Sequence, residues 1–444
     1  MRFTTAEIAA ATGGTSSVDV ASGEDATIDG ASQDGRALTT GQLFIPLVAE
    51  RDGHDFIEGA IANGAGAYLT HRDSDTAAGT TPAIRVEDTT QAMRDLAAAA
   101  RARMAGPVIA ITGSVGKTST KDLLAGTVAG TFKTHQSAKS FNNEIGVPLT
   151  LLNSPDDTEV AIIEMGARGI GHIADLCEIV SPTVGIITTV AGAHTGEFGS
   201  VENIAIAKGE LVEALPSDGI AVLNGDNPLV AGMAPRTQAR VMTFGHDEGN
   251  DIRIESVSLD DELRPTFTMA TDWGRVVARP PTRGAHMATN TAAAVGTALF
   301  LGVSIEAVEA GFGEVEVSPW RMDVQRSTSG ALIINDSYNA NPTSMRGALD
   351  SLSRLGHSRK IAVLGYMGEL GDTEAEDHRE IAAEANAIGA EVITVGTDLY
   401  GVPACSDVAA ADAAIGALSE DCAVLVKGSR SAGLEVLAAK LLSR

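Results

Sequence analysis

Pro107-Val-Ile-Ala-Ile-Thr-Gly-Ser-Val-Gly-Lys-Thr-Ser119 is the segment that decides the fold of this 444-residue chain. Its apolar run from Val108 to Ile111 predicts a buried strand, and the residues from Lys117 onward predict a helix. The loop between them therefore presents backbone N–H groups at a helix N-terminus, where phosphate groups bind. Its glycines allow the backbone to approach phosphate oxygens closely, so the segment predicts a nucleotide-binding loop.

The residues expected to surround the phosphates are consecutive: Gly113, Ser114, Val115, Gly116, Lys117, Thr118 and Ser119. In such loops the lysine reaches the β- and γ-phosphates and the hydroxyl after it ligates Mg²⁺, which are the roles predicted for Lys117 and Thr118. The spacing is the short form G-x-x-G-K-T-S, because Ile111 stands where the longer P-loop pattern has its first glycine. Such strings also arise by chance in glycine-rich chains, so the flanking strand and helix carry the prediction.

Composition excludes several classes of protein. A formal charge of −26 would repel nucleic acid or an anionic membrane, so neither is an expected partner. Three cysteines far apart, without metal-ligand spacing, fit reduced thiols in a cytosolic protein. The chain shows neither an apolar leader nor a long apolar run, which predicts a cytoplasmic protein without membrane insertion.

Three α/β domains are expected from the order of apolar runs. Residues 1–104 contain short apolar runs such as 42–47 and predict a small N-terminal α/β domain. An alanine-rich helix over 90–104 then leads to Gly106-Pro107, a plausible hinge. A small first domain is therefore expected to end at this break.

The central domain is expected over 105–317. Strand-like runs alternate there with helical segments, which implies a largely parallel sheet covered by helices. The predicted strands are 160–164, 184–190, 220–224 and 240–244, followed by antiparallel strands within 251–280 and a helix over 285–301.

Strand-like runs and helical segments alternate again over 318–444, which predicts a separate, doubly wound, Rossmann-like domain. Its strands are expected near 331–335, 360–364, 392–395 and 423–426. Its helices are expected near 344–355, 374–387, 408–418 and 431–442. A monomer is the default state for the whole chain.

Polar residues at the ends of predicted strands are candidates for function. Glu164 is placed to hold Mg²⁺ beside Thr118, although a carboxylate there also caps helices. His194 follows the strand 184–190 in a glycine-rich loop and could reach the same edge, or it is a surface histidine. By composition alone, Lys208 is a helix lysine whose stem covers apolar surface.

Further polar groups gather in three loops. Asn142 and Asn143 follow the helix after the glycine loop and could contact a sugar or phosphate. The segment 335–342 has a turn and N-cap composition, which is its ordinary explanation. Lys427 and Arg430 follow a late strand, where a basic pair could meet an anionic substrate.

Taken together, these strings resemble the Mur ligases over nearly the whole chain. The matching strings include Gly-Ser-Val-Gly-Lys-Thr-Ser119, Ser-Phe-Asn-Asn-Glu-Ile-Gly-Val-Pro148, Glu-Met-Gly-Ala167, His194, Ala-Lys-Gly-Glu210, Asp-Ser-Tyr-Asn-Ala-Asn-Pro342 and Val-Lys-Gly-Ser-Arg430. The resemblance implies an ATP- and Mg²⁺-dependent ligase that joins D-alanyl-D-alanine to UDP-N-acetylmuramoyl-tripeptide in peptidoglycan precursor synthesis. It also implies an N-terminal UDP-sugar domain, a central ATPase domain and a C-terminal ligase domain that closes over the site.

The resemblance also implies individual roles. Thr118 and Glu164 would hold one Mg²⁺, and His194 with a carbamylated Lys208 would hold a second. ATP contacts are implied for Asn290, Arg321 and Asp336, and catalytic roles for Lys117, Lys208 and His194. Substrate contacts are expected from Asn142, Asn143, Tyr338, Asn339, Asn341, Lys427 and Arg430.

Two positions differ from the family pattern, and two alternatives stay open. Gly35 stands where the family usually has serine in Asp-Ser-Arg, and Tyr366 replaces a usual aspartate. One alternative is a related ATP-dependent ligase with another acceptor, such as a folylpolyglutamate-like enzyme. The other is a nucleotide-binding regulatory subunit without catalysis. The third residue of the tripeptide, meso-diaminopimelate or L-lysine, is also open.

Overall fold

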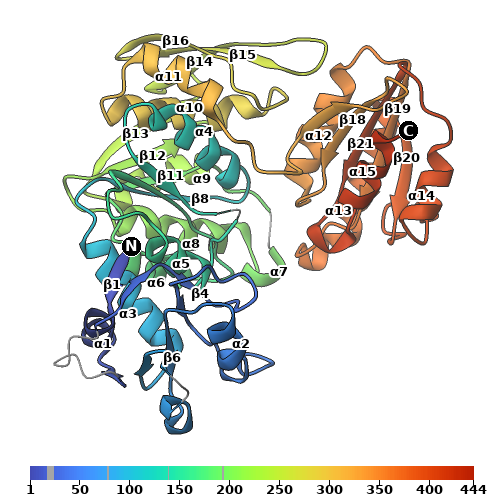
Figure 1. Ribbon diagram of the computed structural model, residues 1–444. Helices are drawn as coiled ribbons and strands as arrows, with labels where there is room; N and C mark the ends of the chain where they lie inside the picture. Colours follow the sequence, from blue (N-terminus) through green and yellow to red (C-terminus); the bar gives the residue numbers. More distant parts are fainter. Residues whose placement is uncertain (18–24, 78–79, 139, 193–194) are drawn as a thin grey trace. The chain divides into compact units, whose positions relative to one another are not determined.

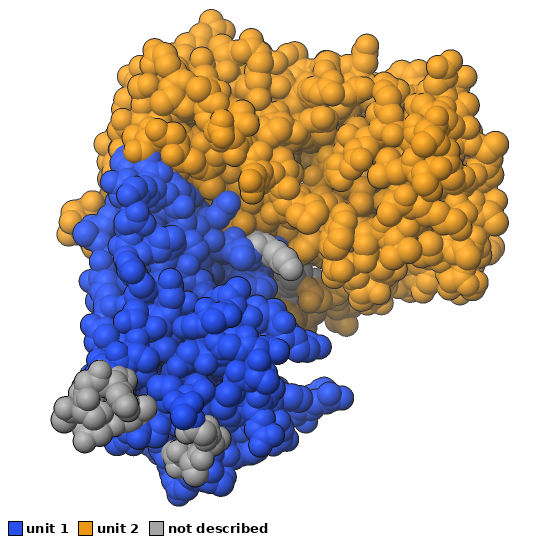
Figure 2. All heavy atoms as spheres, viewed as in Figure 1, with its two compact units in different colours: residues 1–110, 132–166, 173–184 blue, residues 111–131, 167–172, 185–444 orange. Residues whose placement is uncertain are grey.

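The computed structural model describes residues 1–17, 25–77, 80–138, 140–192 and 195–444. Figure 1 shows their helices and strands, and Figure 2 shows the two compact units that they form. Unit 1 comprises Met1–Ala110, Phe132–Gly166 and Ile173–Val184, and unit 2 comprises Ile111–Thr131, Ala167–His172 and Gly185–Arg444. No helix in these described ranges is long and apolar enough to cross a membrane.

Unit 1 begins with two small sheets. In one, β1 (Arg2–Thr4) pairs antiparallel with β3 (Thr27–Asp29). The other has the order β2-β7-β6-β5-β4 and is parallel except for the β2–β7 pair. Its strands are β2 (Thr15–Ser16), β4 (Ala31–Ser32), β5 (Leu43–Phe44), β6 (Ala67–Thr70) and β7 (Ala83–Arg85). The helices of this part are α1 (Thr5–Thr12), α2 (Ile57–Ala62) and α3 (Thr89–Ala102).

Only part of the apolar run 42–47 is a strand, because β5 covers Leu43–Phe44. Gly41 before it has φ 90, and Pro46 after it has no backbone N–H to donate to a neighbouring strand. Phe44 and Tyr68 nevertheless pack with Ile57 in one buried cluster. The apolar run thus contributes to the core through Phe44, although little of it pairs as a strand.

The remainder of unit 1 carries β9 (Thr134–Gln136), which pairs parallel with β10 (Val160–Glu164). It also contains α5 (Gly146–Leu152) and most of α6 (His172–Val180). β8 (Val108–Thr112) and β11 (Val184–Ile187) each have residues in both units. β10 confirms the predicted 160–164 strand, and all of its residues are buried.

Unit 2 starts with the end of β8 and the helix α4 (Lys117–Ala129). β12 (Ile220–Asn224), β13 (Arg240–Gly245) and β14 (Ile252–Leu259) pair parallel in that order. β14, β15 (Pro265–Thr271) and β16 (Gly274–Ala278) then pair antiparallel, as predicted for 251–280. The helices of this part are α7 (Thr195–Phe198), α8 (Val201–Glu213), α9 (Pro228–Ala231), α10 (Met287–Phe300) and α11 (Ile305–Gly311).

The last part of unit 2 is a five-stranded sheet of order β17-β18-β21-β19-β20. Only β17 runs antiparallel to its neighbour. The strands are β17 (Asp323–Arg326), β18 (Leu332–Asp336), β19 (Arg359–Gly365), β20 (Glu391–Val395) and β21 (Cys422–Lys427). The helices are α12 (Pro342–Arg354), α13 (Glu374–Ala387), α14 (Val408–Ile415) and α15 (Glu435–Leu442). The predicted doubly wound sheet is confirmed.

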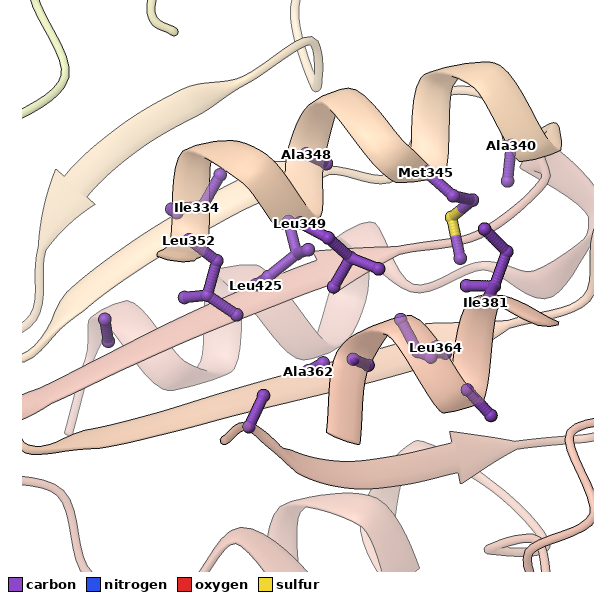
Figure 3. Packing of buried hydrophobic residues seen from close by; sticks show 14 of the residues in the cluster. Ile334, Ala340, Met345, Ala348, Leu349, Leu352, Ala362, Leu364, Ile381 and Leu425 are labelled. Carbon is purple, nitrogen blue, oxygen red and sulfur yellow. The ribbon is translucent and has the colours of Figure 1, made fainter. Parts of the chain in front are cut away.

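Each face of this sheet has its own apolar core. Figure 3 shows Met345, Leu349 and Leu352 of α12 lying over the strands, with Ile381 of α13 beside them. On the other face, α14 and α15 supply residues such as Ile415 and Leu437 to a second buried cluster. Alternate residues of one strand enter different clusters, which is the period-two pattern of a sheet covered on both faces.

Three predicted elements are too long. The strand expected over 184–190 ends at Ile187. The helix expected over 408–418 ends at Ile415, because Gly416 has φ 68. The helix expected over 431–442 begins at Glu435, since a short 3₁₀ turn precedes it and Gly433 has φ 62.

His378 is a buried polar residue in the first half of α13. Its Nε2 accepts a hydrogen bond from the Met367 N–H at 3.0 Å, so the neutral ring carries its proton on Nδ1, which meets the Glu374 carbonyl oxygen at 2.6 Å. Tyr366 stacks on the ring and Tyr400 meets it edge-on. Burial lowers the pKa of His378 below its usual value.

We expect acid to destabilise this part of the chain through His378. The unfolded chain takes up a proton near pH 6.5 that the folded ring resists, so the free energy of unfolding should fall below that pH by at most about 1.4 kcal/mol per pH unit. Denaturant unfolding at pH 7.5, 6.0 and 5.0 measures the fall. A His378→Gln protein should lack this component; an unchanged pH dependence in that variant would exclude His378 as its source.

Candidate active site

The glycine loop lies between the end of β8 and the first turn of α4, as predicted. The Lys117 Nζ donates to the Gly113 carbonyl oxygen at 2.7 Å, so the ammonium lies over the loop. From the segment after β11, Thr188 Oγ1 donates to the Val115 carbonyl oxygen at 2.6 Å. The Ser114 N–H donates to the Thr189 carbonyl oxygen at 2.8 Å. The loop is thus fixed from outside, which preorganises a phosphate cradle.

Asn290 on α10 packs directly against this loop. Gly116 has φ 90, and a Cβ there would stand 2.4 Å from the Asn290 Oδ1. The predicted nucleotide contact therefore lies beside the predicted phosphate loop, although 174 residues separate them in the sequence (290 − 116).

We expect Gly116→Ala to weaken ATP binding by at least about 10-fold, since a left-handed conformation costs an L-residue about 1–2 kcal/mol before the collision with Asn290 is counted. Calorimetric titration with a non-hydrolysable ATP analogue measures the loss. Gly130→Ala, at the other end of α4, is the matched control: Gly130 has φ −71, and no atom of the described residues lies within 4 Å of its Cβ position. Equal affinity in both variants would contradict the cradle.

Arg321 reaches the same helix from the chain that leads into the last sheet. Its Nη2 donates to Thr118 Oγ1 at 2.9 Å, and its guanidinium lies 4.2 Å from the centre of the Tyr338 ring. The neighbours on both sides have positive φ, 61 at Trp320 and 50 at Met322. Each such conformation costs about 1–2 kcal/mol, so contacts elsewhere must hold this segment.

Asp336 and Lys427 form a buried ion pair at the ends of β18 and β21. Parallel pairing sets Asp336 opposite Lys427. The side chains are 14% and 2% exposed, and Lys427 Nζ also donates to the Asn339 carbonyl oxygen at 2.9 Å. Asp336 Oδ1 accepts from the Met322 N–H at 3.0 Å, next to Arg321. The pair therefore ties the strand ends to the Arg321 segment.

The other polar residues of this region have local partners. Asn341 caps α12 with Ser344 in a capping box, which is the ordinary explanation offered by the sequence. Asn339 Oδ1 accepts from the Ala340 N–H at 2.9 Å. Arg430 pairs with Glu435 and lies 4.4 Å from the centre of the Trp320 ring. Tyr338 and Arg430 thus each take part in a cation–π contact with the segment around Arg321.

In unit 1, Asn142 and Glu164 are hydrogen-bonded. The Asn142 Nδ2 donates to Glu164 Oε1 at 2.8 Å, and Glu164 is 1% exposed. Asn143 instead accepts from the Gly146 N–H at 2.9 Å, at the start of α5. Asn142 therefore orients the carboxylate predicted to bind metal, while Asn143 stabilises a helix N-terminus.

The predicted metal ligands are divided between the units. Thr118 and Lys208 belong to unit 2, Glu164 belongs to unit 1, and His194 lies outside the described residues. Lys208 on α8 is 3% exposed, so it does not extend into water as its composition alone suggested. Burial, and then the charge of Lys117, lower the pKa of Lys208 well below its usual value. That these four residues share metal ions stays a prediction.

Two further features were not predicted. One is Asp122 on α4, which accepts from the Ser318 N–H at 2.8 Å. Its spacing of four residues from Thr118 was the available signal, because both then lie on one helix face. The other is a cavity of about 490 Å³ in unit 1, lined among others by Asp34, Gly35 and Arg36. Asp34 accepts from Arg36 at its edge.

A second group of potential metal ligands, Asp52, His54 and His71, has a structural explanation. His54 Nδ1 lies 2.7 Å from Asp52 Oδ1, and its Nε2 accepts from the His71 N–H at 3.3 Å. Arg72 pairs with the other oxygen of Asp52. Both ring nitrogens of His54 are therefore engaged within the chain.

Comparison with known proteins matches three family models in chain order. These are "Mur ligase family, catalytic domain" over residues 27–101, "Mur ligase middle domain" over 111–298 and "Mur ligase, glutamate ligase domain" over 320–430. Among curated proteins, the UDP-N-acetylmuramoyl-tripeptide--D-alanyl-D-alanine ligase of Escherichia coli is 34% identical over 93% of both chains.

Solved structures agree with this likeness. MurF from Acinetobacter baumannii superposes with a TM-score of 0.88 at 29% identity, covering 100% of this chain and 99% of that one. The MurF ligase from Thermotoga maritima, solved in complex with ADP, gives 0.81 at 26% identity, covering 93% and 97%.

Proposed function

This chain belongs to the Mur ligase family, and on that premise we propose that it is an ADP-forming ligase that joins D-alanyl-D-alanine to UDP-N-acetylmuramoyl-tripeptide. The product is a peptidoglycan precursor. One observation carries the proposal beyond likeness: Arg321 donates to Thr118 of the phosphate loop. A cationic side chain from the segment entering the last sheet thus meets the loop that would hold ATP.

The chemistry proceeds in two displacements. A carboxylate oxygen at the end of the tripeptide attacks the γ-phosphorus of ATP, the bond to the β-phosphate oxygen breaks, and an acyl phosphate and ADP form. The Lys117 ammonium and the loop N–H groups neutralise charge that develops on the phosphoryl oxygens. The dipeptide amine then attacks the acyl carbon, phosphate leaves and the amine loses a proton. Closure of the site would protect the acyl phosphate from water.

Three of the four proposed ligands would offer oxygen, which Mg²⁺ prefers: the Thr118 hydroxyl, the Glu164 carboxylate and a carbamate on Lys208. Thr118 with Glu164 would hold one ion, and His194 with carbamylated Lys208 the other. Bound Mg²⁺ supplies positive charge to the phosphoryl oxygens. The Asn142 hydrogen bond holds the Glu164 carboxylate in one orientation, because the amide donates to its Oε1 at 2.8 Å.

The surroundings of Lys208 support its proposed carbamylation. Only the neutral amine attacks carbon dioxide, forming an N–C bond and releasing one proton. The lowered pKa of buried Lys208 favours that neutral form. The resulting carbamate oxygen is an anionic ligand, which fits a cation site far better than an ammonium group.

Substrate contacts follow from the remaining polar groups. The cavity at Asp34 and Gly35 would take the uridine part of the precursor, and Asn142 and Asn143 its sugar or phosphate region. Residues beside the Arg321 segment would bind the dipeptide and its carboxylate: Tyr338, Asn339, Asn341, Lys427 and Arg430. Asn290, Arg321 and Asp336 would contact ATP.

We propose three functional domains over 1–104, 105–317 and 318–444, for the UDP-sugar, for ATP and for ligation. A monomeric, cytoplasmic enzyme fits this role, since ATP and UDP-linked precursors are made inside the cell. Light scattering of the purified protein at working concentration tests the monomer.

The deciding experiment is phosphate release from ATP and Mg²⁺ with UDP-N-acetylmuramoyl-tripeptide, with D-alanyl-D-alanine added or withheld. Release that requires both substrates, with the pentapeptide product seen by mass, is the expected result. Parallel assays with the diaminopimelate and L-lysine tripeptides identify the third residue. Turnover only with another acceptor would favour a related ligase, and no turnover with any acceptor would favour a nucleotide-binding subunit.

A further inference from the structure

The segment that carries Arg321 lies along one face of the phosphate-loop helix. Thr118, Asp122 and Gly126 are spaced by four residues on α4 and therefore share that face. The residues that contact them belong to a segment that runs antiparallel to α4: Arg321 contacts Thr118, Ser318 contacts Asp122 and Val315 contacts Gly126. The helix that follows the phosphate loop thus also contacts the segment that leads into the last sheet.

The contact at Gly126 is very close. A Cβ at Gly126 would stand 2.4 Å from Val315 Cγ2 and 3.0 Å from the Gly311 carbonyl oxygen. Reciprocally, a Cβ at Gly311 would stand 2.7 Å from the Gly126 carbonyl oxygen. Backbone meets backbone here, so the segment is seated against α4 before it reaches Asp122.

Asp122 is the polar anchor of this arrangement. It is 3% exposed, its Oδ2 accepts from the Ser318 N–H at 2.8 Å, and its Oδ1 pairs with Lys121 at 3.1 Å. A buried carboxylate keeps a fixed direction because its partners are fixed. Three residues beyond Ser318, Arg321 takes its place at Thr118.

The backbone around Arg321 needs such an anchor. The positive φ at Trp320 and Met322 is unfavourable for side chains of this size. After Arg321, Asp336 holds Met322. Before Arg321, Asp122 holds Ser318, so one carboxylate fixes the segment on each side of the arginine.

We propose that Asp122 is a positioning residue that sets Arg321 against the phosphate loop, and hence against bound ATP. The inference rests on the proposed function for the role of Arg321. It gives Asp122 no contact with substrate, and its effect on the reaction passes through the arginine.

Two neutral substitutions isolate the anchor. Asp122→Ala and Asp122→Asn both remove the charge beside Lys121, but only asparagine keeps an oxygen that accepts from Ser318. We expect Asp122→Ala to weaken binding of a non-hydrolysable ATP analogue with Mg²⁺ by about 10- to 100-fold, as a misplaced contact group does. Asp122→Asn should stay within about threefold of the parent protein. Calorimetric titration and thermal unfolding are measured for each.

A double-mutant cycle tests whether Asp122 acts through Arg321. In an Arg321→Ala protein, adding Asp122→Ala should weaken analogue binding by less than about twofold. A full further loss there, or an equal loss in Asp122→Asn and Asp122→Ala, would overturn the proposal. If Asp122→Ala does not fold, Ser318→Pro removes the donor while leaving α4 intact, and it should reproduce the loss only when Arg321 is present.

This readout is independent of the acceptor. Failure of the unmodified protein to form the pentapeptide would refute the proposed ligation, whereas the cycle on analogue binding decides the role of Asp122. Both outcomes can therefore be assigned separately.

Discussion

Lys117→Ala should lower the rate of phosphate transfer by about 10²–10³-fold, equivalent to about 2.7–4 kcal/mol of transition-state stabilisation. The lysine ammonium lies over the glycine loop, 2.7 Å from the Gly113 carbonyl oxygen. From there it can stabilise the negative charge that develops on the phosphoryl oxygens. Alanine leaves the loop backbone unchanged and removes only the cation. Single-turnover phosphate release with saturating ATP measures the effect on chemistry rather than on binding.

Lys133→Ala is the matched control for Lys117→Ala. Lys133 is 65% exposed and pairs with Asp157 at the surface, so its removal should leave the rate unchanged. A Lys117→Ala protein that releases phosphate at a near-normal rate would remove this lysine from the reaction.

Lys208→Ala should lower ligation by at least about 100-fold, because it would remove the carbamate oxygen proposed to bind the second Mg²⁺. The cavity left by the side chain lies in a buried site, and a small carboxylate can supply the missing anionic oxygen. We therefore expect acetate to restore part of the activity in a concentration-dependent way. The steady-state rate of ligation, measured without acetate and at increasing acetate concentrations at fixed ionic strength, gives the extent of this recovery.

Acetate should not restore ligation activity to the Lys117→Ala protein, since that variant lacks a cation rather than an anionic oxygen. If Lys208→Ala keeps full activity, Lys208 has no role in ligation. Loss without rescue, together with normal activity of the parent protein in carbon dioxide-free buffer, would show that the lysine acts without carbamylation.

Long buried runs made most of the fold predictable. Residues 160–164 and 220–224 became strands β10 and β12 with the predicted bounds, because a continuous apolar run bounded by polar residues fits a strand covered on both faces. Element ends were less predictable where single residues decide them. Left-handed glycines at 416 and 433 moved the ends of α14 and α15 relative to the predicted bounds.

The phosphate loop was predictable because its residues are consecutive. The ATP contacts expected of Arg321 and Asn290 came from the family resemblance, since no local pattern links these residues to the loop. Asp122 escaped prediction because its partner Ser318 is 196 residues away, and only the tertiary structure brings the two together. Asn341 shows the opposite case, where a polar residue in a predicted site is also a helix cap.

The stacking of Trp320 on Arg430 gives the protein an optical reporter. The chain has only two tryptophans, and the other, Trp273, is 41% exposed on a β-hairpin. A Trp273→Phe protein therefore emits from Trp320 alone. Any ligand that moves the Arg430 guanidinium away from the indole ring changes the surroundings of the excited state. The proposed binding of the dipeptide at Arg430 would therefore be visible as a change in fluorescence, without labels or turnover.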